Sequence, residues 1–329
     1  MRVSVVMATY NGENYLRQQL ESILEQSELP DELVVSDDGS SDKTLSILRD
    51  FEKTAPFVTR LLVREKPLGF ASNFANACLC ATGDVIIFCD QDDSWRPDKV
   101  AAIKGYFHDH PEKELVLHDI AVCDADLRPI VGSYFSYLRS ESHDPSYLVK
   151  GCATAITQSL RDRAYPLPIG GRWTHDCRVH AMAQFSETRG MIARILSDYR
   201  VHSSNTSGYV LPKNNWKGSI GAYLRKNSLA KSSLAYTTIQ YFSLNDISDF
   251  ELEEFYLASS SHSEEMPFIS SRLKGANDSL NKRSRIARSG SFHHKVLRYL
   301  KLAFTAGYVD AGGFYSLCSD IMNLFRRRK

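Results

Sequence analysis

Three aspartates, Asp90, Asp92 and Asp93, fall within four residues immediately after the apolar run 85–89. A short continuous apolar run is typical of a central parallel strand covered on both faces, so these carboxylates are predicted to lie at its carboxyl end. Like charges this close repel one another and lose solvation when buried. A hard divalent cation that also bridges phosphates would compensate them, whereas a solvated acidic turn is the plainer alternative.

Two more polar loops follow apolar, strand-like runs earlier in the chain. Residues 9–12 (Thr-Tyr-Asn-Gly) follow the run 3–8, and residues 37–42 (Asp-Asp-Gly-Ser-Ser-Asp) follow the run 32–36. Because open α/β sheets bind ligands where their strands end, the three loops are expected to converge on one edge. No strand leads into G-x-G-x-x-G or G-x-x-x-x-G-K-[ST], so a cation is the expected holder of any bound phosphate.

The elements that position these loops alternate along the chain. Hydrophobic periodicity predicts helices at 14–26, at 42–53 with Asp42 as the N-cap, and at 70–80, and Pro97 suits the first turn of another. A further strand is predicted at 59–63. This alternation with short connections predicts a doubly wound α/β sheet with at least four near-parallel strands.

The net charge of +1 hides two regions of opposite sign. Residues 271–329 hold 13 Lys or Arg and 3 Asp or Glu, against 27 and 36 in the residues before them. The seven cysteines are odd in number and show no C-x-x-C pairing, which indicates reduced structural thiols of a cytosolic protein. The N-terminal apolar run is too short for a signal sequence, and no window predicts a membrane span.

Four motifs in register carry a family likeness: Val5-Val-Met-Ala-Thr-Tyr-Asn-Gly12, Val34-Val-Ser-Asp-Asp-Gly-Ser-Ser-Asp42, Ala81-Thr-Gly-Asp84 and Phe88-Cys-Asp-Gln-Asp-Asp93. Together they resemble the nucleotide-sugar domain of glycosyltransferase family 2, which has the GT-A fold, an α/β fold with a mostly parallel mixed sheet. The segment Tyr199-Arg-Val-His202 with Asn205 is similar to the closing signature of the rhamnosyltransferase-like branch. The likeness implies a GT-A catalytic domain at 1–212 and a helical, basic C-terminal region at 213–329.

The resemblance also assigns roles to single residues. The implied donor-binding residues are Thr9, Tyr10, Asn11, Asp37, Asp38 and Asp90. Asp37 falls where the family contacts the uracil or thymine ring, and an acidic acceptor suits a ring N–H donor. Asp92 and His202 are the implied ligands of Mg²⁺ or Mn²⁺, with Asp90 and Asp93 as further candidates. An imidazole ligand would favour Mn²⁺ more than an all-oxygen site does.

Asp176 is the implied catalytic base. His175-Asp176 falls where the family carries an acidic pair whose second member takes the proton from the acceptor, and here the first member is a histidine. Structurally, the segment from Trp173 also predicts the start of a helix, where Asp176 would stabilise the first turn. His180 shares that helix face and is expected to be solvated.

The implied reaction is an inverting transfer of one sugar per encounter. Processive relatives carry Gln-x-x-Arg-Trp after the base, whereas here Ile169 takes the place of that Gln and Arg172-Trp173 precedes Asp176. The favoured donor is dTDP-rhamnose and the favoured acceptor a glycan of bacterial surface polysaccharide, O-antigen or capsule. The alternatives are a UDP-hexose or UDP-N-acetylhexosamine donor, a catalytically silent nucleotide-sugar-binding scaffold subunit, and a nucleotidyltransferase. The last would want a Gly-rich basic loop after the first strand, which residues 9–12 do not supply.

The basic tail has two readings that carry equal weight. From about residue 214 the alternation stops, and apolar helical faces rimmed by Lys and Arg suit either an anionic membrane surface or a helical subdomain with a solvated rim. Nucleic acid is not expected as a partner because the segment holds no recognisable binding motif. A lipid-linked acceptor would place a cytoplasmic enzyme peripherally on the inner face of the plasma membrane.

Overall fold

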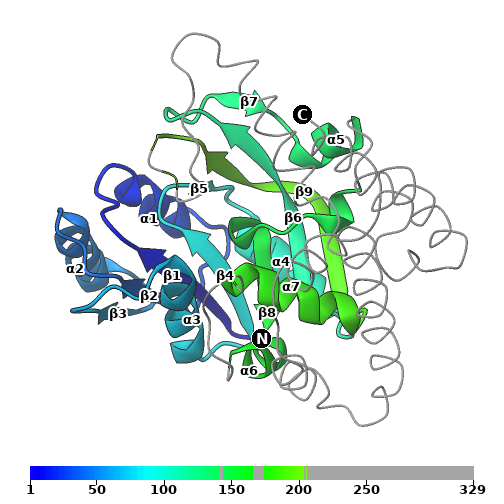
Figure 1. Ribbon diagram of the computed structural model, residues 1–329, viewed down its shortest axis with the longest axis horizontal. Coiled ribbons are helices and arrows are strands. Elements are labelled where there is room, and N and C mark those ends of the chain that lie inside the picture. The colour runs from blue at the N-terminus through cyan, green and yellow to red at the C-terminus, as the bar shows by residue number, and fades with distance from the viewer. Residues whose placement is uncertain (141–143, 166–173, 204, 206–329) are drawn as a thin grey trace, which may run out of the picture. The chain divides into compact units, whose positions relative to one another are not determined.

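The computed structural model describes residues 1–140, 144–165, 174–203 and 205 (Figure 1). The predicted domain boundary at 212, the C-terminal region 213–329 and the segment around Ile169 lie outside the described residues. No helix within the described ranges is long and apolar enough to cross a lipid bilayer.

One sheet organises the described part of the chain. Its strands run in the order β3-β2-β1-β4-β8-β6-β9-β5, and β7 pairs with β6. The bounds are β1 Val3–Thr9, β2 Glu32–Asp37, β3 Val58–Val63, β4 Val85–Asp90, β5 Ser94–Trp95, β6 Leu115–Cys123, β7 Pro129–Val131, β8 Thr154–Thr157 and β9 Arg189–Arg200. Strands β3, β2, β1 and β4 are parallel, as predicted, while β8 runs antiparallel to both β4 and β6.

The parallel register places the predicted loops together. Thr9 at the end of β1 is opposite Asp37 at the end of β2, and Ala8 is opposite Asp90 at the end of β4. The three polar loops therefore leave the same sheet edge from adjacent strands. This edge holds the candidate site.

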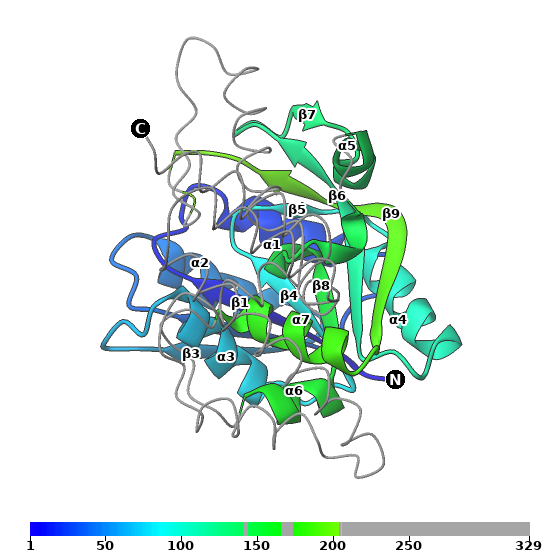
Figure 2. The ribbon, with the colours of Figure 1, turned by 45° about the vertical axis from the view of Figure 1, so that its right-hand side comes forward.

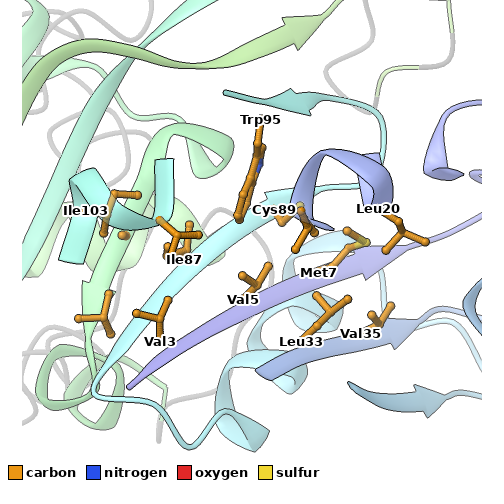
Figure 3. Packing of buried hydrophobic residues seen from close by; sticks show 14 of the residues in the cluster. Val3, Val5, Met7, Leu20, Leu33, Val35, Ile87, Cys89, Trp95 and Ile103 are labelled. Atoms are coloured by element: carbon orange, nitrogen blue, oxygen red, sulfur yellow. The ribbon is translucent and has the colours of Figure 1, made fainter. Parts of the chain in front are cut away.

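Helices cover both faces of the sheet (Figure 2). They are α1 Leu16–Leu24, α2 Thr44–Thr54, α3 Phe70–Cys80, α4 Lys99–Asp109, α5 Tyr134–Ser140, α6 Gln158–Ala164 and α7 His175–Phe185, with short 3-10 turns η1 Pro145–Tyr147 and η2 Gly151–Ala153. On one face, alternate side chains of β1, β2 and β4, including Val5, Leu33 and Ile87, pack with Leu20 of α1 and Ile103 of α4 (Figure 3). On the other face the ring of Phe88 meets Phe74 of α3. Burial on both faces explains why these strands are continuously apolar.

Two predicted helix starts differ from the structure. Helix α2 begins at Thr44 with Lys43 at its N-cap, so Asp42 is not the N-cap. Asp42 lies one residue earlier, where its carboxylate accepts the backbone N–H of Thr44 at 2.9 Å and that of Glu13 at 3.1 Å. The Asp42 carboxylate therefore joins the start of α2 to the loop that follows β1. Helix α4 likewise begins at Lys99, two residues after Pro97.

A buried carboxylate ties the first strands together at their amino ends. Glu32 Oε1 accepts the Ser4 hydroxyl and the backbone N–H of Thr82, both at 2.5 Å, and Arg60 pairs with the other oxygen. Burial alone would raise the pKa of Glu32, but these donors outweigh it and lower the pKa to about 2. Glu32 therefore stays ionised inside the fold.

Candidate functional site

The acidic loop is held against the far end of the chain by a short strand. After β4 ends at Asp90, the chain passes through Gln91, Asp92 and Asp93 into β5, which pairs antiparallel with β9. Ser94 lies opposite Asp198 in this pairing. The residues that follow β9 are therefore brought beside the loop that follows β4.

Asp92 and His202 meet at this junction. Asp92 Oδ2 lies 2.9 Å from His202 Nε2, and both side chains are largely buried. Asn205 closes the turn, since its Oδ1 accepts the His202 backbone N–H at 2.6 Å. The His202 ring also lies against Tyr15 at a centroid distance of 4.5 Å. A carboxylate oxygen and an imidazole nitrogen thus lie side by side, and their role as metal ligands stays a prediction.

Arg200 holds the acidic loop, residues 90–93, through several hydrogen bonds. Its Nε donates to the Asp92 carbonyl at 2.7 Å, while its two terminal nitrogens donate to Gln18 Oε1 and to the Ala125 carbonyl. The backbone N–H of Arg200 donates to Asp93 Oδ1 at 2.9 Å. All three guanidinium nitrogens therefore donate to protein oxygens, and Arg200 is only 2% exposed.

The carboxylates of Asp90 and Asp93 are shielded from solvent. Asp93 is fully buried, and Asp90 is partly buried at the sheet edge. Burial and the adjacent Asp92 carboxylate raise the pKa of Asp90 to about 7. Burial, with Asp90 and Asp92 nearby, raises the pKa of Asp93 well above its usual range. Such an accumulation of carboxylates favours a compensating cation.

A buried lysine lies behind this cluster. Lys99 Nζ donates to the Cys152 carbonyl at 3.0 Å and to Ser197 Oγ at 2.9 Å, and it lies 4.0 Å from the centre of the Trp95 ring. Burial lowers the pKa of Lys99 to about 8, although nearby acidic groups oppose that shift. Lys99 thereby joins α4, η2 and β9 beneath the acidic loop.

The second acidic loop is held by its own hydrogen bonds. Asp37 accepts from Thr9 Oγ1 at 2.7 Å and from the backbone N–H and hydroxyl of Ser40 at 2.8 and 2.6 Å. Asp38 accepts the backbone N–H groups of Leu68 at 2.6 Å and Gly69 at 2.9 Å. Both carboxylates therefore shape the loops around the predicted base pocket, and their contact with a nucleobase stays a prediction.

The first loop is linked to the acidic loop by one side chain. Gln91 accepts the Tyr10 backbone N–H at 3.0 Å and donates to the Tyr10 carbonyl at 3.1 Å. The Tyr10 side chain is 54% exposed, so it is available at the edge of the site. Asn11 adopts a left-handed conformation with φ of 47°, and its Oδ1 accepts the Ser41 backbone N–H at 2.9 Å.

Asp176 lies in the first turn of α7. Thr174 is the N-cap, and its hydroxyl donates to Asp176 Oδ1 at 2.5 Å. The same oxygen accepts the backbone N–H of Cys177 at 2.8 Å. The helix-stabilising role that the sequence suggested is therefore present, and it fixes the orientation of a partly exposed carboxylate near Asp90.

The expectation that His180 is solvated is wrong. His180 is fully buried, and its Nε2 lies 2.8 Å from Thr154 Oγ1. Its side chain faces the sheet at Thr154, the first residue of β8. His175 is also buried, stacked on Phe74 at 4.1 Å, and burial lowers the pKa of both histidines.

Residues 4–159 match the sequence profile of the family described as Glycosyl transferase family 2. Residues 4–159 belong to glycosyltransferase family 2. The matched stretch contains the first loop, both acidic loops and the strand β8. The resemblance inferred from the four motifs is confirmed.

Relatives of this family 2 domain match parts of the chain. It is 31% identical over 126 residues to an uncharacterized protein of Mycobacterium bovis, covering 38% of this chain and 36% of that protein. It is 26% identical over 216 residues to an uncharacterized glycosyltransferase of Nostoc, covering 62% and 66%. It is 39% identical over 98 residues to the dTDP-rhamnosyl transferase RfbG of Shigella flexneri, covering 29% and 34%. These matches span about a third to two thirds of the relatives' lengths.

Solved structures share the fold. The chain is similar to S. aureus TarS 1-349 in complex with UDP-GlcNAc, with a TM-score of 0.56, 16% identity and coverage of 100% of this chain and 93% of that one. It is also similar to the mannosyltransferase PcManGT of Pyrobaculum calidifontis in complex with GDP-Man and Mn²⁺, with a TM-score of 0.52, 19% identity and coverage of 99% and 86%. The predicted α/β GT-A fold class is confirmed.

The structure places three further residues around the acidic loop. Arg200 holds the loop, Lys99 lies behind it, and Cys152 lies close to Asp90 and Asp93. Arg200 belongs to the segment Tyr199-Arg-Val-His202 that the sequence analysis singled out, but its contact with the acidic loop was not predicted. Lys99 and Cys152 gave no signal, because an isolated lysine on a helix and an isolated cysteine are ordinarily exposed and structural, respectively.

Proposed function

We propose that this protein is an inverting, metal-dependent, non-processive glycosyltransferase. It transfers rhamnose from dTDP-rhamnose onto a glycan acceptor of bacterial surface polysaccharide. The observation that carries the proposal is the 2.9 Å approach of Asp92 Oδ2 to His202 Nε2 beside Asp90, on the sheet edge of a family 2 domain. The pair is buried and lies next to further carboxylates, so it is suited to binding a cation.

The ligand atoms of Asp92 and His202 suit a divalent cation. Asp92 and His202 would hold Mg²⁺ or Mn²⁺, because a buried carboxylate oxygen and an imidazole nitrogen 2.9 Å apart are ligands that these ions accept. When bound, the ion would supply positive charge to the departing nucleoside diphosphate. Arg200 and Asn205 would hold the two ligands in place through the Asp92 carbonyl and the His202 backbone N–H.

Asp176 is the proposed base. Its Oδ1 is held by Thr174 and the Cys177 N–H, so the carboxylate has a fixed direction at the start of α7. It would take the proton from an acceptor hydroxyl as that oxygen attacks the anomeric carbon. Attack from the side opposite the leaving group inverts the configuration at that carbon.

The donor proposal rests on two observations. The segment 199–205 is similar to the signature of the rhamnosyltransferase-like branch, and a relative 39% identical over 98 residues is named a dTDP-rhamnosyl transferase. Thr9, Tyr10, Asn11, Asp37 and Asp38 would line the base pocket, and Asp90 would contact the ribose. A UDP-hexose or UDP-N-acetylhexosamine is the alternative donor, since the fold neighbour TarS was solved with UDP-GlcNAc.

We further infer a lipid-linked acceptor and peripheral association with the inner face of the plasma membrane. This inference is supported by the basic character of residues 271–329, which hold 13 Lys or Arg but only 3 Asp or Glu. Clustered Lys and Arg attract anionic headgroups at about 1 kcal/mol per residue. Flotation with anionic and neutral vesicles tests this, and equal recovery with both would contradict it.

The function is tested with a panel of nucleotide sugars. The purified protein is incubated with dTDP-rhamnose, UDP-glucose and UDP-GlcNAc, each with Mg²⁺, Mn²⁺ or chelator, and release of nucleoside diphosphate is measured. We expect release from dTDP-rhamnose that needs the cation and is lost in Asp92→Asn. Release that persists with chelator would remove the metal mechanism, and release from UDP-sugars alone would remove the rhamnosyl proposal. Binding of a nucleotide sugar without release, even when a glycan acceptor is present, would favour the scaffold alternative.

A further inference from the structure

A second group of ligand atoms lies beside the Asp92–His202 pair. Within the part of the chain that the structure describes, one carboxylate oxygen each of Asp90 and Asp93 and the sulfur of Cys152 all lie within 4.8 Å of one another. Asp93 and Cys152 are buried at 0% and 1% exposure, while Asp90 is partly open at the sheet edge. The group is therefore reachable past Asp90.

Asp93 has an oxygen with no hydrogen-bond partner among the described residues. Its Oδ1 accepts the Arg200 backbone N–H at 2.9 Å, whereas Oδ2 is buried and unpartnered. One of the two lysine nitrogens that act on this group, Lys99 Nζ, is already shared by the Cys152 carbonyl, Ser197 Oγ and the Trp95 ring. Because buried polar atoms are nearly always paired, this oxygen marks a place for a cation or a proton.

This group carries an excess of negative charge that favours a cation. Two carboxylates and a thiolate would carry three negative charges, and the nearby Lys99 and Lys150 ammonium groups offset them only in part. A bound cation would neutralise the negative charge that remains. A sulfur ligand beside two carboxylates selects a borderline-soft ion such as Zn²⁺ over Mg²⁺.

We propose that Asp90, Asp93 and Cys152 form a second cation site, suited to Zn²⁺ and separate from the Asp92–His202 pair. Zinc–sulfur and zinc–oxygen bonds of about 2.3 and 2.1 Å place ligand atoms roughly 3.5 Å apart, so the group contracts by about 1 Å on binding. The Cys152 thiol loses its proton to solvent as the sulfur–zinc bond forms. Three protein ligands leave a fourth position for water or an anion.

The site has a consequence that rests on the proposed function. Asp90 is the proposed ribose contact, so an ion that engages Asp90 would withdraw it from the donor. Zn²⁺ is therefore expected to inhibit transfer supported by Mg²⁺ or Mn²⁺. Because ion binding is measured without any sugar donor, failure of the proposed function leaves the test of the site intact.

The test uses Co²⁺ as a coloured substitute for Zn²⁺ on the full-length protein under reducing conditions. A thiolate ligand gives a sulfur-to-cobalt charge-transfer band in the near ultraviolet, which we expect in wild type and expect Zn²⁺, but not excess Mg²⁺, to remove. Cys152→Ser should abolish the band. The control Cys89→Ser alters an equally buried thiol beside Asp90 that is outside the group, and it should keep the band.

Two results would overturn the site: no charge-transfer band in wild type, or a band that survives in Cys152→Ser. The wild-type measurement stands even if Cys152→Ser does not fold, which its circular dichroism melting curve reveals. Asp93→Asn provides a second variant, expected to weaken Co²⁺ binding by about tenfold or more while the band remains at saturation. Unchanged Co²⁺ affinity in Asp93→Asn would remove Asp93 from the site.

Discussion

The Nε of Arg200 donates to the backbone carbonyl of Asp92 at 2.7 Å across 108 residues of chain. Its neighbouring nitrogens reach Gln18 and Ala125, so one guanidinium joins α1, the acidic loop and the turn after β6. The loop that carries the proposed metal ligand Asp92 is thus held by the last residue of β9, two residues before the other proposed ligand, His202. Stability of the fold and geometry of the site depend on the same side chain.

Arg200→Lys should lower both stability and cation affinity. A lysine has a single nitrogen and cannot donate to Asp92, Gln18 and Ala125 together, so buried acceptors are left unpaired. We expect a loss of about 2–4 kcal/mol in the free energy of unfolding, measured by urea denaturation. Mn²⁺ affinity, measured by electron paramagnetic resonance, should fall by about tenfold or more.

Arg194→Lys is the matched control for that substitution. Arg194 lies on the same strand, but it is exposed and pairs with Asp98 at the surface. Exposed ion pairs contribute little, so its effect should stay within about 0.5 kcal/mol. Equal stability of the two variants would refute the role given to Arg200.

Asp92→Asn and His202→Gln should be non-additive in Mn²⁺ binding. If both side chains bind one ion, either substitution removes most of the affinity and the double variant loses little more. Calorimetric titration of the wild type, the two single variants and the double variant gives the coupling. His110→Gln, a change at an exposed residue next to α4, controls for a general effect of losing a histidine. Strictly additive losses would show that the two residues do not share an ion.

Asp176→Asn should separate catalysis from helix capping. Asparagine keeps an oxygen that accepts the Cys177 N–H, so the melting temperature should change little while sugar transfer falls by about 10²–10⁴-fold. Donor affinity should be unchanged. Thr174→Ala should lower stability by about 1 kcal/mol and lower transfer far less than Asp176→Asn does, because the Cys177 N–H still holds Asp176 Oδ1. An active Asp176→Asn protein would rule out Asp176 as the base.

Glu32 should make stability fall in acid. Its pKa is about 2 in the folded chain and near 4.5 when the chain is unfolded, so its contribution is complete above pH 4.5 and is lost as the pH falls toward 2. Glu32→Gln should cost about 1–3 kcal/mol at neutral pH and flatten the fall between these values. Urea denaturation at a series of pH values measures both effects. An equally steep fall in Glu32→Gln would assign the acid sensitivity to other groups.

Much of the fold could be predicted from local patterns. The alternating strands and helices between Val3 and Cys80 were predicted to within a few residues, because apolar runs and amphipathic periodicity are local consequences of burial. The N-cap of α2 was not predicted correctly, because Asp42 accepts hydrogen bonds from both Thr44 and Glu13 and lies one residue before the N-cap. His180 was misassigned because helix periodicity shows that a face exists but not what that face packs against.

The sequence by itself determined which chemistry was available: carboxylates at three strand ends, a histidine after a closing signature, and the family to which they belong. Tertiary structure alone decided which of these groups meet. The 2.9 Å approach of His202 to Asp92 depends on the pairing of β5 with β9, and the group formed by Cys152, Asp90 and Asp93 depends on packing behind it. Sheet order and side-chain packing are non-local, because they minimise the free energy of the whole chain and not of any segment that can be read in sequence.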